Sequence, residues 1–143
     1  MDERLNTIPV IELWGRLVVP LQGDVTDSQM ETLQATLLER IRQKGPRGLV
    51  IDASGVWLMD SHLCAVLGRI AGAARLMGTR PVLAGLSPSV VMTLDQMGIA
   101  LDGIETALGL ESALERLGLD VSETDEDDQS ELIDGDEEEG MDR

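Results

Sequence analysis

The spacing of apolar and polar positions predicts alternating strands and helices over the first 118 residues. Short aliphatic runs bounded by Gly, Pro or polar residues are typical of strands, and they lie at residues 8–14, 17–21, 49–51, 81–84 and 104–107. Apolar residues three and four positions apart are typical of amphipathic helices, and they lie at residues 30–41, 63–77, 90–97 and 110–117. The predicted order is therefore β-β-α-β-α-β-α-β-α.

This order predicts an α/β domain with a mixed β-sheet of about five strands and about four helices. A hairpin around Gly15 starts the sheet, and the strand–helix units after it favour parallel strands joined by right-handed crossovers. Pro20 interrupts the second strand and indicates either an edge position or a bulge. The sequence leaves open which helices share a face of the sheet.

Capping residues mark where the helices begin and end. The first helix has two candidate capping boxes, Thr26 with Gln29 and Ser28 with Glu31. Gly78 is the expected C-terminal cap of the second helix. The third is expected to begin at 87–88, a serine cap followed by proline, and to end at Gly98.

Residues 119–143 differ sharply in composition from the predicted domain at 1–118. Residues 120–143 hold 13 of the 27 acidic residues and one of the 11 basic ones, so residues 1–119 carry only −4 of the net charge of −16. Such a segment buries too little apolar surface to offset its ordering entropy, and we expect a disordered acidic tail. Its default role is solvation, with 132–133 (Leu-Ile) as the one hint of a docking element.

Composition excludes several classes of function. The acidic balance and the near absence of aromatic residues, two Trp with no Phe or Tyr, disfavour binding to nucleic acid or anionic lipid. No run of 18 or more apolar residues predicts a membrane span, and the charged start does not resemble a signal peptide. With Cys64 as the single cysteine, we expect a cytoplasmic protein.

The triplet Asp60, Ser61 and His62 contains the residue types of a hydrolase triad. Consecutive helical positions point about 100° apart, so these side chains are not expected to relay protons. One Cys and one His do not make a metal site, and no phosphate-binding glycine loop is present. We therefore predict no enzyme activity, no metal and no cofactor, with a small serine hydrolase as a remote alternative. Cys64 is expected to be a buried apolar residue.

Residues 50–61, Val-Ile-Asp-Ala-Ser-Gly-Val-Trp-Leu-Met-Asp-Ser, resemble the signature of STAS domains, the fold of anti-sigma-factor antagonists. Further segments at 66–68, 76–78, 85–88, 97–101 and 104–108 resemble the stressosome scaffold branch of this family. The resemblance covers residues 8–118. Simple antagonists commonly continue Asp-Ser with Ser-Gly-Leu, whereas this chain continues with His62, Leu63 and Cys64.

The resemblance implies a non-catalytic phosphorylation switch at Ser61, with Thr93 as a possible second site. It implies a switch loop formed by Gly55, Val56, Trp57, Leu58, Met59, Asp60 and His62. The implied partners are STAS-containing sensor or co-antagonist subunits in a large hetero-oligomer, with a homo-oligomer possible. The resemblance also implies that a serine/threonine switch kinase is sequestered and then released when Ser61 is phosphorylated, and that a PP2C-type phosphatase resets the system. The alternative is a simple antagonist that binds an anti-sigma kinase.

Position alone also favours Ser61 as a phosphorylation site. Backbone N–H groups and the positive end of the helix dipole lie beside a serine at a helix entrance. Two alternatives remain open: Ser61 as a helix cap only, or Asp60 as the cap. Thr93 is as readily a packing residue, His62 a surface or interface residue, and Trp57 either a core residue or an exposed interface anchor.

Overall fold

The computed structural model describes residues 7–57, 59–96 and 104–120. Contacts divide the chain into one unit at 1–113 and a second at 114–143. The described elements follow the predicted order and are listed here: β1 Ile11–Leu13, β2 Arg16–Gly23, α1 Asp27–Lys44, β3 Gly48–Val56, α2 Ser61–Leu76, β4 Arg80–Ala84, α3 Pro88–Gln96, β5 Glu105–Ala107 and α4 Leu110–Arg116.

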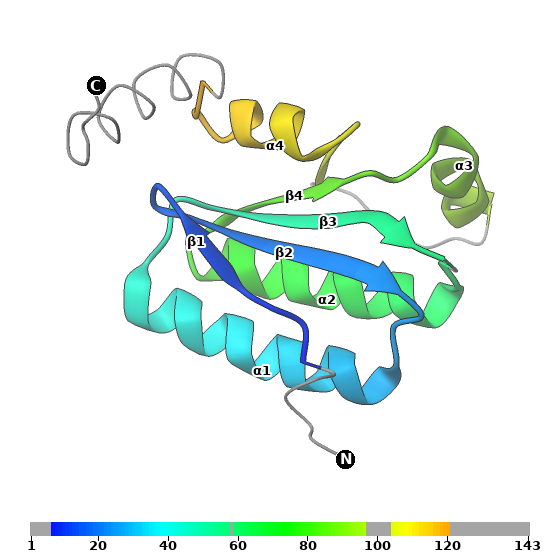
Figure 1. Ribbon diagram of the computed structural model, residues 1–143, viewed down its shortest axis with the longest axis horizontal. Helices are drawn as coiled ribbons and strands as arrows, with labels where there is room; N and C mark the ends of the chain where they lie inside the picture. The colour runs from blue at the N-terminus through cyan, green and yellow to red at the C-terminus, as the bar shows by residue number, and fades with distance from the viewer. Residues whose placement is uncertain (1–6, 58, 97–103, 121–143) are drawn as a thin grey trace, which may run out of the picture. The chain divides into compact units, whose positions relative to one another are not determined.

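The five strands form one mixed sheet in the order β1-β2-β3-β4-β5. β1 pairs antiparallel with β2, and every later neighbour pairs in parallel. Because strands β2 to β5 are parallel, their carboxyl ends lie at the same edge of the sheet (Figure 1). The mixed α/β fold predicted from the sequence is confirmed.

Helices α1 and α2 cover the same face of the sheet (Figure 1). The core between them and the strands is aliphatic, and it contains Leu17, Val19, Leu49, Ile51 and Leu83 from the sheet with Leu33, Leu37, Leu67 and Ile70 from the helices. Successive strand residues point to opposite faces, and Val18, Val50 and Val82 on the other face are also buried. Burial on both faces explains why these strands read as continuous apolar runs.

The first hairpin turns one residue earlier than the sequence suggested. Trp14, expected to end the first strand, occupies the turn with Gly15, and both have positive φ, 47° and 79°. Two consecutive positive φ values are typical of a type I′ turn, whose twist matches that of the flanking strands. The buried Arg16 donates a hydrogen bond from its guanidinium to the Trp14 carbonyl oxygen.

Pro20 lies at an irregularity and not on an edge strand. β2 has β1 on one side and β3 on the other, but β1 pairs only as far as Val18. The register of β2 against β3 shifts between Pro20 and Gln22. The missing N–H of proline is thus accommodated at a bulge, which was one of the two predicted alternatives.

Helix ends follow the local rules closely. Thr26 and Gln29 form the capping box of α1, with the Thr26 hydroxyl accepting from the Gln29 N–H at 3.1 Å. Gly78, at φ 88°, follows the end of α2, and the N–H of Thr79 donates to the Ala74 carbonyl at 2.9 Å in a Schellman arrangement. α3 begins at Pro88 as predicted, and its expected end at Gly98 lies outside the described residues.

Candidate functional site

The entrance of α2 is capped by Asp60. The Asp60 carboxylate accepts a hydrogen bond from the Leu63 backbone N–H, with 2.8 Å between Oδ1 and N, and the Asp60 backbone is extended as a cap requires. Ser61 is the first residue of the helix. Of the alternatives left open by the sequence, the structure selects Asp60 as the cap.

Ser61 is exposed, and its hydroxyl is not used for capping. It lies at the amino end of a 16-residue helix, where unpaired backbone N–H groups and the helix dipole create positive potential. Because Ser61 is exposed, a phosphoryl group on this oxygen would extend into solvent beside the amino end of the helix. The geometry is therefore chemically compatible with a phosphoacceptor.

His62 contacts a different helix. Its Nε2 lies 3.1 Å from Oδ1 of Asp27, the first residue of α1, and both side chains are more than half exposed. This pair links the entrances of the two helices that cover the sheet. The His62 ring nitrogen thus interacts with Asp27 and the Asp60 carboxylate with Leu63, so the triplet does not have the geometry of a proton relay.

Trp57 stands on the surface beside this entrance. Its side chain is 82% exposed, which excludes the core alternative. The Trp57 N–H donates to the Gly23 carbonyl at 3.0 Å, and its ring lies 4.0 Å from the position that a Gly23 side-chain carbon would take. That distance is an ordinary van der Waals contact, so the indole does not itself require glycine; the positive φ of Gly23, 69°, does favour it at the carboxyl end of β2.

The predicted switch loop is shorter in the structure. Gly55 and Val56 belong to β3, where they pair with Gln22 and Gly23, and His62 lies inside α2. β3 continues to pair with β2 beyond the Pro20 bulge, so it is longer than the apolar run at 49–51 predicted. The loop proper is 57–60, with Met59 packed partly against the core; Leu58 lies outside the described residues.

Close backbone contacts fix the strand ends around the loop. A side-chain carbon on Gly55 would lie 3.1 Å from the Leu21 carbonyl oxygen, and one on Gly85 only 2.6 Å from the Ser54 nitrogen. Gly85 also has φ 83°, a conformation that favours glycine. Sequence reasoning did not single out Gly85 as structurally required, although its place directly after a strand is a usable signal.

Cys64 is buried, as predicted. Burial, and to a lesser extent the nearby Asp60 charge, raises the pKa of its thiol. Thr93 lies on α3, but its side chain is outside what the structure describes. In the described ranges, no group of three or more His, Cys, Asp or Glu side chains is arranged to hold a metal ion. No helix in those ranges has the length and apolarity needed to cross a membrane.

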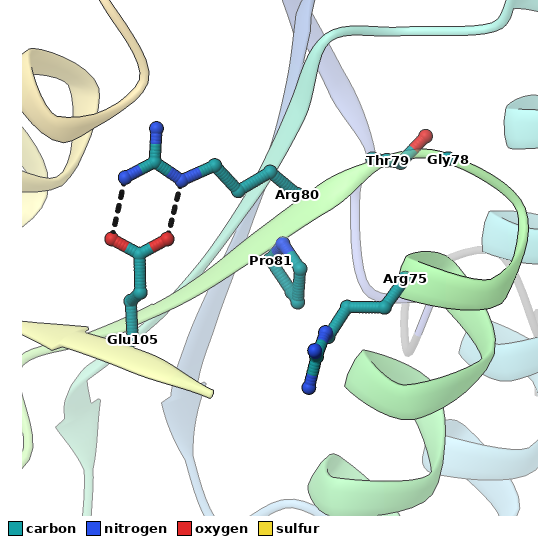
Figure 2. Close-up of a pocket in the computed structure, with 6 residues that line it drawn as sticks. All are labelled: Arg75, Gly78, Thr79, Arg80, Pro81 and Glu105. Atoms are coloured by element: carbon teal, nitrogen blue, oxygen red, sulfur yellow. Dashed lines mark hydrogen bonds and ion pairs between the residues drawn. The ribbon is translucent and has the colours of Figure 1, made fainter. Parts of the chain in front are cut away.

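Away from the loop, a shallow hollow of about 380 Å³ lies at the opposite ends of the strands. It is lined by Arg75, Gly78, Thr79, Arg80, Pro81 and Glu105 (Figure 2). Arg80 and Glu105 form a two-bond ion pair between β4 and β5, while the Arg75 side chain lies beside Pro81 (Figure 2). The hollow contributes nothing to the Ser61 surface.

A family model for the STAS domain matches residues 5–113. The chain belongs to the STAS domain family. Among solved structures, this STAS domain is similar to a variant of RsbS from Moorella thermoacetica, with 33% identity and a TM-score of 0.70 over 78% of this chain and 94% of that one. It is also similar to a chain of the stressosome structure, described as a signal integration and transduction hub, with 32% identity and a TM-score of 0.66 over 77% and 96% of the two chains.

Curated relatives include the RsbT co-antagonist protein RsbRC of Bacillus subtilis (strain 168), 31% identical over 74% of this chain. RsbRA of the same organism, also an RsbT co-antagonist protein, is 29% identical over 76% of this chain. The STAS domain spans only 38% and 40% of the lengths of these two relatives. The match therefore covers one domain of longer proteins.

Proposed function

We propose that this STAS domain is a non-catalytic, phosphorylation-switched scaffold of a stressosome-like complex. It holds a serine/threonine switch kinase and releases it when Ser61 is phosphorylated. STAS-containing co-antagonist subunits are its assembly partners, and a PP2C-type phosphatase resets the switch. The observation that carries the proposal is the exposed Ser61 hydroxyl at the entrance of α2, left free by the Asp60 cap.

The described roles of similar proteins support the proposed scaffold function. Two similar proteins are RsbT co-antagonists, and one similar structure is part of the stressosome. The RsbS variant carries a glutamate in place of a serine, a substitution that adds negative charge as a phosphate does. A charge-sensitive serine in the STAS domain of this chain would act by the same physical principle.

Electrostatics explains how one phosphate releases a partner without unfolding the domain. Two added charges about 6 Å from a carboxylate such as Asp60 cost about 1 kcal/mol at the dielectric of water. Once a docked partner excludes water and the effective dielectric falls to about 20, the cost rises to about 5 kcal/mol. Because about 1.4 kcal/mol is a tenfold change in affinity, the bound state weakens far more than the free domain.

The surface around Ser61 has the composition of a protein-binding site. Trp57 contributes a large exposed aromatic side chain, and tryptophan is enriched among the residues that dominate interface energies. Asp24, Asp27 and Asp60 are exposed and lie on the loops and helix starts at the same end of the domain. The added phosphate therefore joins an already acidic surface.

Calorimetric titration of the 143-residue chain with the purified RsbT homologue of its source organism tests the proposal. We expect Ser61→Ala to bind like the unmodified chain and Ser61→Asp to bind at least tenfold more weakly. Thr36→Asp, with the same charge on the exposed side of α1, is the matched control and should bind normally. Phosphate located elsewhere by mass spectrometry, together with unchanged binding by Ser61→Asp, would falsify the switch.

Assembly size separates the scaffold from the simple antagonist. The scaffold forms a large complex with co-expressed STAS-containing subunits, visible by electron microscopy. A chain that stays monomeric beside those subunits and binds one anti-sigma kinase would instead be an antagonist.

A further inference from the structure

Most of the cations of the first unit lie at the helix ends, loop and strand start beside the amino ends of the parallel strands. α1 and α2 both end at this side of the sheet, opposite the Ser61 loop (Figure 1). The cations are Arg42 and Lys44 in the last turn of α1, Arg47 in the next loop, Arg75 in the last turn of α2 and Arg80 at the start of β4. We call this surface the amino-end face.

Hydrogen bonds join these loops into one surface. The Arg47 N–H donates to the Gly15 carbonyl at 2.9 Å, and the Arg80 N–H donates to the Arg47 carbonyl at 3.3 Å. The Thr79 hydroxyl, which is buried, donates to the Pro46 carbonyl at 3.0 Å. Hydrogen bonds therefore hold the backbone segments that carry these cations together.

Three cations of the amino-end face are available for a partner. Arg42 pairs with Glu39, and Arg80 pairs with Glu105. Lys44, Arg47 and Arg75 form no ion pair within the described part of the chain. Arg75 lines the same hollow as Pro81, and Figure 2 draws bonds only between Arg80 and Glu105, not to Arg75.

Exposed apolar side chains lie among these charges. Leu76 is 91% exposed, Trp14 46% and Met77 42%. Trp14 is in the turn bonded to Arg47 through Gly15, and the other two lie at the end of α2. A partner of this face should therefore combine negative charge with a few apolar residues.

Residues 121–143 combine negative charge with a few apolar residues. The segment holds 12 acidic residues, and the apolar pair 132–133 lies within the acidic run. We propose that the amino-end face binds the acidic segment 121–143 of a second copy of this chain. That several copies come together rests on the proposed scaffold function. That the amino-end face binds this segment rests on the complementarity of their charges and apolar residues.

The same electrostatics keeps the segment away from the Ser61 end, where Asp24, Asp27 and Asp60 repel it. Because exposed charges are screened beyond about 8 Å at physiological salt, the contact should be weak and salt-dependent. Binding at the amino-end face leaves Ser61 uncovered, so assembly and switching use opposite ends of the domain.

Cross-linking between two populations of the 143-residue chain tests the proposal. One population carries Leu76→Cys and the other Ile133→Cys, so every product joining these two positions connects different copies. Cys64 is buried with a raised thiol pKa, and it should react slowly with a short bismaleimide. We expect the mixed product, identified by peptide mass, to exceed by about threefold or more the product from the control Arg69→Cys, which lies exposed in the middle of α2.

Charge variants then test the mechanism of recognition. Arg47→Gln combined with Arg75→Gln should lower the mixed product by about threefold or more, and Arg69→Gln should leave it unchanged. Raising salt to about 0.5 M should lower it similarly. Three results would each overturn the proposal. The Arg69→Cys control could give as much mixed product as Leu76→Cys, the yield could be unchanged by both the charge variants and the salt, or no mixed product could form. None of these readouts involves Ser61, so failure of the switch and failure of this contact are told apart.

Discussion

The Asp60 carboxylate accepts the Leu63 N–H at 2.8 Å, and this bond assigns the capping of α2 to Asp60 and not to Ser61. Had Ser61 been the cap, its phosphorylation would have removed a cap and loosened the helix. With Asp60 in that role, the neighbouring hydroxyl is free to be modified. Under the proposed function, Asp60 stabilises the helix and Ser61 carries the switch.

Asp60→Ala should destabilise the domain by about 0.5–2 kcal/mol, because the Leu63 N–H loses its acceptor. Asp60→Asn keeps an oxygen at the same place and should stay close to the unmodified chain. Urea unfolding followed by circular dichroism measures both. Equal stability of Asp60→Ala and Asp60→Asn would show that the cap contributes nothing.

Phosphorylation of Ser61 should leave the fold intact. The helix dipole favours the phosphate by about 0.3–1 kcal/mol, while the Asp60 charge opposes it, so the free energy of unfolding should change by no more than about 1 kcal/mol. Thermal unfolding of the enzymatically phosphorylated chain and its unmodified form gives the comparison. A large loss of stability would mean that the switch works by local unfolding and not by surface charge.

Trp57→Ala should weaken binding of the switch kinase by about tenfold or more, as expected for an exposed aromatic anchor in an interface. Its free energy of unfolding should change by less than about 0.5 kcal/mol, because the side chain is 82% exposed. Leu76→Ala, which removes an even more exposed apolar side chain at the opposite end, is the control. Parallel titrations that show equal affinity for all three proteins would remove Trp57 from the interface.

Gly85→Ala and Gly72→Ala should have opposite effects. The first places a carbon 2.6 Å from the Ser54 nitrogen at φ 83°, and the strained backbone alone costs about 1–3 kcal/mol. The second adds a carbon to the middle of α2 with no atom within 4 Å, which should stabilise the helix by up to about 1 kcal/mol. Chemical denaturation of the two variants checks the sign of each change.

Alkylation of Cys64 should need a higher pH in the native protein than in urea. Burial, with the Asp60 charge adding to it, raises the pKa of the native thiol, so its thiolate fraction at any pH is lower. The neutral thiol stabilises the fold fully below the unfolded pKa of about 8.5, and this contribution is lost as the pH rises through the native pKa. Iodoacetamide labelling rates from pH 7 to 10 measure the difference, and identical native and denatured profiles would contradict it.

Local patterns predicted the elements well because each is specified by nearby residues. Met30, Leu33, Leu37 and Ile41 form one face of α1 at helical spacing, and all four are buried. The strand limits were less predictable: β3 continues to Val56 because Gly55 and Val56 pair with Gln22 and Gly23, which is a contact between distant segments. The acidic tail at 119–143 and the role of Ser61 stay predictions.

The sequence by itself determined the order of strands and helices, the aliphatic core and the position of Ser61 at a helix entrance, since periodicity and capping act over a few residues. Only the tertiary structure decided that Asp60 caps α2, that Trp57 points outward and that His62 meets Asp27. It also gathered the cations of separate loops at one end of the sheet. These features depend on which distant backbone segments lie side by side, and that is fixed by the packing of the whole domain.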